Sequence, residues 1–126
     1  MLDTNVFEPA ESRWQDIYKH LTAAGFEVYP PATKVGECTS RYIVVTNNGS
    51  TRHAAFSTDI DLYSVMVYVP RTAYSQLEVT VQEVKRAMKG LAPMITPYGY
   101  QSPSFYDESV KAHMVSIDYK NYKKML

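Results

Sequence analysis

The hydrophobic residues of this chain recur at two intervals, one typical of helices and one typical of strands. From Trp14 to Leu21 they recur every three or four residues. Ser12 and Gln15 precede this stripe with the spacing of a capping box, and Gly25 follows it, where glycine favours a helix end. This pattern predicts a helix over about 12 to 24.

A second helical stripe begins after Pro70, with Thr72 as a candidate N-cap and Gly90 near the end. Its apolar members share one helix face and are Tyr74, Leu77, Val81, Val84, Met88 and Leu91. We expect this helix to pack on the core along the whole stripe.

The predicted strands begin with a short one at 26–29, which ends at two prolines. Residues 41–46 are rich in β-branched side chains, and Asn48-Gly49 follows, a dipeptide that favours a type I′ hairpin turn. A two-residue turn would place Thr46 opposite Thr51. We therefore predict a returning strand at 51–57, at an edge or in a projecting ribbon.

Two later segments also have strand patterns. Residues 60–69 are apolar on both faces, which is typical of a central strand, and residues 110–119 alternate. Between them, residues 93–108 contain three prolines and several aromatic residues, so we expect an ordered loop there.

The order of these elements predicts one α+β domain over residues 1–126. It would have a mixed, mainly antiparallel sheet of four to five strands with two helices packed on one face. We expect residues 1–11 and 121–126 to be flexible ends. Because the central and last strands are apolar on both faces, we also expect a neighbouring subunit to cover the second face.

Composition and charge exclude several classes of function. Thirteen basic residues balance thirteen acidic ones, so there is no overall field to attract a nucleic-acid backbone. The single cysteine, Cys38, has no partner within the chain, which suggests a reducing compartment. No apolar run approaches the ~20 residues of a membrane span. We expect neither sequence-specific nucleic acid nor a membrane as a partner.

The sequence lacks the patterns that usually carry catalysis. There is no nucleophile elbow, no glycine-rich phosphate loop and no metal-ligand spacing among the histidines and Cys38. One alternative is a small metal-dependent nuclease using Asp59, Asp61, Glu83 and Lys85. Residues 83 and 85 fall on the second predicted helix, where they would point in different directions, which disfavours that site. We expect no enzyme activity, no cofactor and no metal.

Several segments together resemble the tail-completion or tail-terminator proteins of long-tailed phages and prophages. They are residues 42–45, residues 61–69 with the helix after them, and residues 106–108 with 111–119. The resemblance spans roughly residues 12 to 124 and rests on strand and helix patterns, not on a catalytic signature.

This resemblance implies a non-enzymatic subunit that forms a ring, commonly six-fold, at the head-proximal end of the tail tube. Such a ring ends tube growth and joins tail to head, so the implied partners are other copies, the tail tube protein and head-tail connector proteins. The implied location is the virion, with assembly in the bacterial host cytoplasm. A head-closure or connector protein of the neck is the alternative.

A ring needs two different complementary surfaces on each subunit. The predicted hairpin could supply one and the aromatic loop the other, since tyrosine is common at protein interfaces and the chain has eleven. The contact residues that we predict are Asn48, Gly49, Arg52, His53, Tyr98, Tyr100 and Tyr106.

Overall fold

The computed structural model describes residues 12–53 and 58–124, and within them only the backbone of residues 52, 53, 58, 59 and 122–124. The elements in chain order are α2 (Arg13–Ala23), β1 (Val28–Tyr29), β2 (Tyr42–His53), β3 (Thr58–Pro70), the 3-10 helix η1 (Arg71–Gln76), α3 (Leu77–Met88), the 3-10 helix η2 (Lys89–Leu91), β4 (Thr96–Gln101), β5 (Phe105–Asp107) and β6 (Ala112–Lys124).

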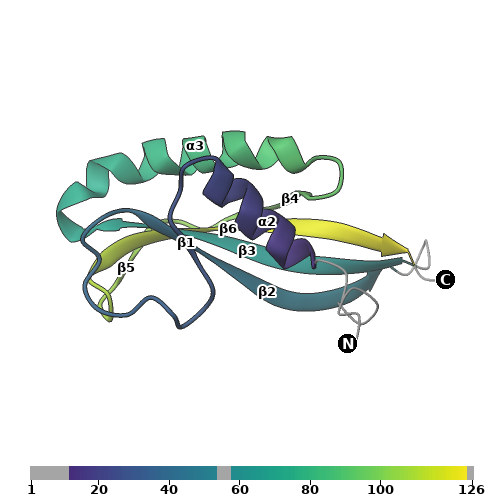
Figure 1. The fold of residues 1–126 in the computed structure, drawn as a ribbon. Helices are drawn as coiled ribbons and strands as arrows, with labels where there is room; N and C mark the ends of the chain where they lie inside the picture. The colour runs from purple at the N-terminus through teal and green to yellow at the C-terminus, as the bar shows by residue number, and fades with distance from the viewer. Residues whose placement is uncertain (1–11, 54–57, 125–126) are drawn as a thin grey trace, which may run out of the picture.

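The predicted α+β class is confirmed. The strands form one sheet in the order β1-β2-β3-β6-β4, with β5 also paired to β6, so the sheet has six strands and not four or five. Only the β1–β2 pairing is parallel. Both helices lie over the same face of the sheet, as Figure 1 shows, and we call it the helix face.

The first helix forms as its sequence predicts. Ser12 Oγ accepts a hydrogen bond from Gln15 N, and the Gln15 side chain accepts one from Ser12 N, which completes the capping box. Ile17 and Leu21 are fully buried against the sheet. Gly25 follows the helix with a φ of 101°, a conformation that glycine adopts without strain.

The second helix is shorter than predicted. Gln76 is the N-cap of α3, and no side chain caps that end, so the predicted Thr72 cap is wrong. Thr72 belongs to η1, where Ala73 has non-helical angles and kinks the chain. The stripe from Leu77 to Met88 is buried as expected, whereas Tyr74 is exposed.

The main core lies between the helices and the sheet. It contains the side chains of β3 and β6 that face the helices, together with the stripes of α2 and α3. β3 lies between β2 and β6 and is apolar on both faces because each face is covered: Val65 and Val67 belong to the main core, and Tyr68 belongs to a second apolar cluster.

The predicted turn at Asn48-Gly49 is wrong, because β2 continues through this dipeptide to His53. Thr46 pairs with Ser64 and Thr51 with Ile60, not with each other. The register shifts by one residue between Asn47 and Ser50, which makes Asn48-Gly49 a β-bulge. Residues 54–57 of the predicted returning strand lie outside the described residues.

The predicted ordered loop at 93–108 contains two short strands, both paired with β6. Proline is tolerated in β4 because this strand lies at the edge of the sheet, where one side needs no donor. The predicted flexible end at 121–126 is also wrong in part, because residues 121–124 continue β6 and pair with β3. Residues 1–11, 125 and 126 lie outside the described residues.

Candidate protein-interaction surfaces

The bulge in β2 is built by two asparagines and a glycine. Gly49 has a φ of 88°, and its N–H donates to Asn47 Oδ1 at 2.7 Å. Asn48 Nδ2 donates to Ser64 Oγ, which in turn donates to Asp118 Oδ1 at 2.9 Å. This chain of hydrogen bonds crosses from β2 to β6 and fixes the direction of the bulge.

Of the contact residues predicted on this strand, Asn48 and Gly49 are exposed. The side chain of Asn48 is nevertheless held by Ser64 and Thr46 of its own chain. Arg52 and His53 belong to β2 and pair with Asp59 and Thr58, and their side chains lie outside the described part. The structure therefore places all four on one strand, beyond the segment that β1 covers.

The predicted aromatic residues lie on the opposite side of the sheet. Tyr98 and Tyr100 are in β4 and are 42% and 57% exposed, and Tyr106 is in β5 and 39% exposed. The ammonium group of Lys120 lies 5.5 Å from the centroid of the Tyr98 ring, a cation–π distance. We call β4, β5 and the residues around them the aromatic edge.

Sequence reasoning missed three members of this edge. The His113 ring lies between the rings of Tyr74 and Tyr106, with centroid distances of 4.6 and 5.3 Å. Phe105, beside Tyr106, is 46% exposed. Tyr74 fits a helical stripe in the sequence, and only the kink at Ala73 turns it away from the core. The register of β5 on β6 brings Tyr106 opposite His113.

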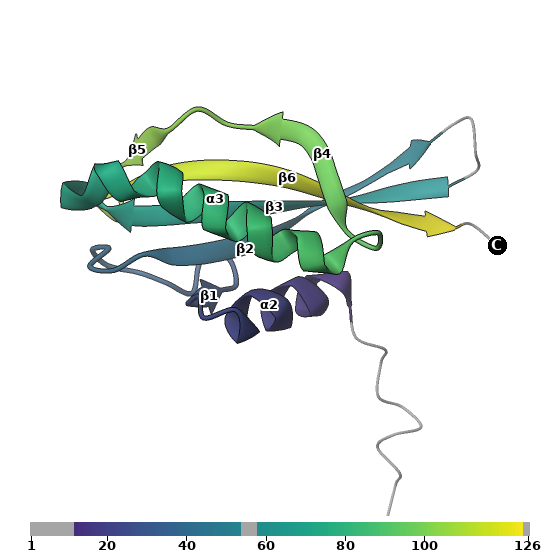
Figure 2. The same ribbon diagram turned by 90° about the horizontal axis from the view of Figure 1, so that it is seen from above.

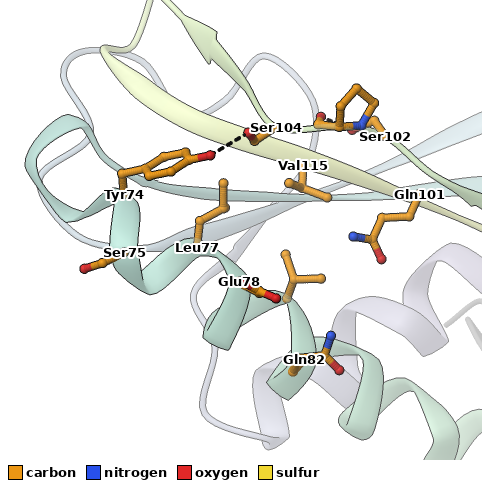
Figure 3. Close-up of a pocket in the computed structure, with 11 residues that line it drawn as sticks. Tyr74, Ser75, Leu77, Glu78, Gln82, Gln101, Ser102, Ser104 and Val115 are labelled. Carbon is orange, nitrogen blue, oxygen red and sulfur yellow. Dashed lines mark hydrogen bonds between the residues drawn. The ribbon is translucent and has the colours of Figure 1, made fainter.

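A cavity of about 320 Å³ separates this edge from the start of α3. Figure 3 shows Leu77 and Val115 between the helix and β6, with Glu78 and Gln82 on the helix side and Gln101 on the strand side. Tyr74 Oη lies 3.0 Å from Ser104 Oγ. None of the eleven lining residues is a histidine, a cysteine or a basic residue. This lining is suited to non-covalent contact with an apolar or amide side chain.

The wall of this cavity is fixed by Ser102. Its N–H donates to Ser116 O at 2.8 Å, and Ser116 N donates to Ser102 Oγ at 2.9 Å. Ser102 is buried although it lies between two exposed strands. The connection between β4 and β5 is thereby attached to β6.

We expected a neighbouring subunit to cover the second face of the sheet, but part of this face is covered by the chain itself. A second apolar cluster lies on this face and contains Cys38, Tyr42, Val44, Tyr68, Ala112 and Met114. The loop between β1 and β2 covers it, with Cys38 N donating to Val110 O at 2.8 Å. A neighbouring subunit is therefore not needed at this end of the face, and that prediction is wrong there.

Cys38 is a buried member of this cluster. Burial raises the pKa of its thiol, and the thiol donates to Ser40 O at 3.2 Å. A raised pKa keeps sulfur in its protonated and poorly nucleophilic form. Cys38 therefore acts as a small apolar side chain in this fold.

Two residues of the nuclease alternative, Asp61 and Glu83, lie far apart. Glu83 forms an ion pair with Arg41, at 2.6 Å, just before the start of β2. Arg41 precedes Tyr42, which pairs with Tyr68, and Asp61 lies seven residues earlier in β3. At about 3.3 Å per residue this separation is roughly 23 Å. Asp61 instead accepts a hydrogen bond from Ser50 Oγ at 2.6 Å.

Within residues 12–53 and 58–124, no three His, Cys, Asp or Glu side chains are grouped so that they could hold a metal ion. In the same ranges no helix has the length and apolar character needed to cross a membrane. No family model matches the chain, and no curated protein matches it.

Proposed function

We propose that this protein is a structural subunit of a phage tail, which forms a ring at the head-proximal end of the tail tube, ends tube growth and joins tail to head. The proposal rests on the sequence resemblance and on one observation in the structure. The two surfaces that carry the predicted contact residues lie on opposite sides of the same sheet, with β3 and β6 between them.

This arrangement favours head-to-tail association. The bulged part of β2 is polar, with Asn47, Asn48 and Ser50 exposed, whereas the aromatic edge exposes tyrosine and phenylalanine rings. Two unlike surfaces on one subunit produce a closed ring or an open filament, whereas a two-fold dimer uses one surface twice. A ring is the closed form that can sit on the end of a tube.

The partners in this proposal are other copies of the chain, the tail tube protein and the head-tail connector proteins. We take six copies as the ring size, the virion as the location and the bacterial host cytoplasm as the place of assembly. A head-closure or connector protein would use the same kind of ring. Purified tail tubes and purified connectors, offered separately, distinguish the two roles by which of them the ring binds.

The first test is the solution mass by light scattering over a wide concentration range, with negative-stain imaging of any large species. We expect a closed ring, of about six copies as the resemblance implies. Tyr100→Ser should lower the fraction of protein in the ring without changing the melting temperature, because Tyr100 is exposed in the monomer. Val35→Ser is the matched control, since Val35 is 77% exposed in the loop between β1 and β2 and should leave the ring unchanged.

Two results would contradict the proposal. A symmetric dimer as the largest species would show that the two unlike surfaces do not associate. Magnesium-dependent cleavage of DNA that is abolished by Asp61→Ala would support the nuclease alternative in place of the structural role.

A further inference from the structure

Three strands form a ribbon that extends past the rest of the fold. Figure 2 shows the end of β2, the start of β3 and the end of β6 continuing beyond α3 and β4. The ribbon consists of residues 50–53, 58–61 and 121–124, which pair with one another in register. We call it the arm. Its middle strand is β3, so β2 and β6 are its two edges.

The β2 edge of the arm has no strand beside it in the described part of the chain. β1 pairs only with Ile43 and Val44. Val45 O is satisfied by the indole of Trp14, whose Nε1 donates to it at 2.7 Å. From Asn47 to His53 no further neighbour is described on this side.

The β6 edge of the arm is open in the same way. β4 pairs with β6 at Ile117, Tyr119 and Lys120, and its pairing ends there. Residues 121–124 pair only with β3 on the other side, as far as the described residues show. Neither open segment contains proline, which would block pairing, but both carry basic residues, Arg52 on β2 and Lys123 and Lys124 on β6, which limit the registers in which another strand can pair.

The register identifies the backbone groups that point outward. Ile43 N donates to Glu27 O at 2.8 Å, so the backbone groups of Ile43 point away from β3. Along a strand, successive residues point their N–H and C=O groups to alternate sides, and the count starts from Ile43. Beyond the bulge the outward residues of β2 are Ser50 and Arg52. Ser116 N and O bond Ser102, so the outward residues of β6 are the even-numbered ones, which are Tyr122 and Lys124 in the arm.

We propose that the β2 edge of the arm pairs in parallel with the β6 edge of the arm in a second copy of this chain. This inference rests on the proposed ring and adds one contact to those made by the bulge and the aromatic edge. β2 and β6 both run antiparallel to β3 and so run in the same direction. Copies related by rotation about an axis along the arm therefore bring the two edges together as a parallel pair, with N–H and C=O groups on both sides.

Charge selects the register of this pairing. In the backbone register of one chain, Arg52 and Lys123 are both opposite Asp59. Placing Arg52 of one copy beside Lys123 of the next would put like charges side by side, which is unfavourable. A shift of two residues places Ser50 beside Lys123, next to Asp61, which pairs with Ser50. Ser50 N and O then face Tyr122 and Lys124 of the second copy.

Disulfide cross-linking tests this register. The variant carries Ser50→Cys and Lys123→Cys, with Cys38→Ala to remove the native thiol. Each copy then has one thiol at each edge, so oxidation of the ring should yield a ladder of covalent oligomers on a non-reducing gel. The matched control carries Thr51→Cys in place of Ser50→Cys. Thr51 is the neighbouring residue on the opposite face of the arm, so we expect no ladder from it.

Each outcome bears on the pairing. A ladder from the Ser50 variant alone supports it. A ring of normal mass without a ladder, or with an equal ladder from the Thr51 control, overturns the edge pairing and leaves the proposed function standing. A protein that is monomeric at every concentration overturns the edge pairing and the expected free ring, and leaves the resemblance to tail-completion proteins standing. The melting temperature of each variant, compared with that of the Cys38→Ala protein, shows whether the fold is retained.

Discussion

The imidazole of His20 occupies the place where a side chain on Gly90 would have to be. An ideal Cβ on Gly90 would lie 2.7 Å from His20 Cε1 and 2.8 Å from Nε2, closer than such atoms approach. His20 Nε2 also donates to Ala87 O at 2.6 Å. The end of α3 and the last turn of α2 therefore come together through one ring and one missing side chain.

Gly90→Ala should lower the free energy of unfolding by about 1 to 2 kcal/mol, because the His20 ring has to move and its bond to Ala87 is strained or lost. Urea unfolding of the two proteins measures the difference. The control is the same change in a His20→Ala background, where the ring is gone and the cost should nearly disappear. An undiminished cost there would assign the effect to the backbone of η2.

Two valines on α3 provide a matched pair for the core. Val81 is 2% exposed and Val79, on the opposite side of the helix, is 58% exposed. Val81→Ala should reduce the free energy of unfolding by roughly 2 kcal/mol through lost burial and a small cavity. Val79→Ala should change it by less than about 0.5 kcal/mol. Similar losses from both would mean that α3 is packed differently.

Stability should fall in alkaline solution because of a buried tyrosine. Burial raises the pKa of Tyr119 from 10.0 to about 12. Below pH 10 the phenol is neutral in both states, and between these values only the unfolded chain loses the proton. The folded state then binds more protons, so the free energy of unfolding decreases as pH rises, by roughly 2 to 3 kcal/mol in full.

Tyr119→Phe isolates this contribution. Chemical unfolding of both proteins at pH 9, 10, 11 and 12 should give a shallower decline for the variant, although other buried tyrosines keep some of the slope. Burial also raises the pKa of Tyr42, Tyr63 and Tyr68. Parallel declines for the two proteins would show that Tyr119 ionises equally easily in both states.

The bulge glycine should tolerate asparagine better than alanine. Gly49 has a φ of 88°, and a Cβ built on it would meet no other atom within 4 Å. A side chain at this position would therefore destabilise the fold through backbone strain and not through a clash with a neighbour. Gly49→Ala should lower the free energy of unfolding by about 1 to 2 kcal/mol, and Gly49→Asn by less, because asparagine visits this conformation more readily. Equal losses, measured by urea unfolding, would argue against a backbone origin.

Elements that depend on neighbouring residues were predictable from the sequence. The capping box of Ser12 and Gln15 forms within four residues, and the apolar stripe of α3 needs only a helix and a core to bury it. The two apolar faces of residues 60–69 likewise indicated a strand with covered sides. Each of these predictions rests on one periodicity and one local signal.

The errors concern choices that distant residues decide. Asn48-Gly49 supplies a positive φ, which a hairpin turn and a bulge both need, and only the pairing of Thr46 with Ser64 selects the bulge. Residues 96–101 form a strand because β6 offers them an edge, a pairing partner some twenty residues away. The exposure of Tyr74 depends on a kink in η1 that the nearby sequence does not predict.

The extra residue in β2 also changes the parity of everything beyond it. Before the bulge the odd-numbered residues of β2 lie on the helix face with Ile43 and Val45, and after it the even-numbered ones do, as Ser50 does opposite Asp61. Deleting Gly49 would leave one residue between Asn47 and Ser50, as β3 has between Tyr63 and Asp61, so Ser50 would stay opposite Asp61 and on the helix face. The bulge therefore lets β2 hold one residue more than the matching part of β3 while Asn47 and Ser50 stay on the same face of the sheet.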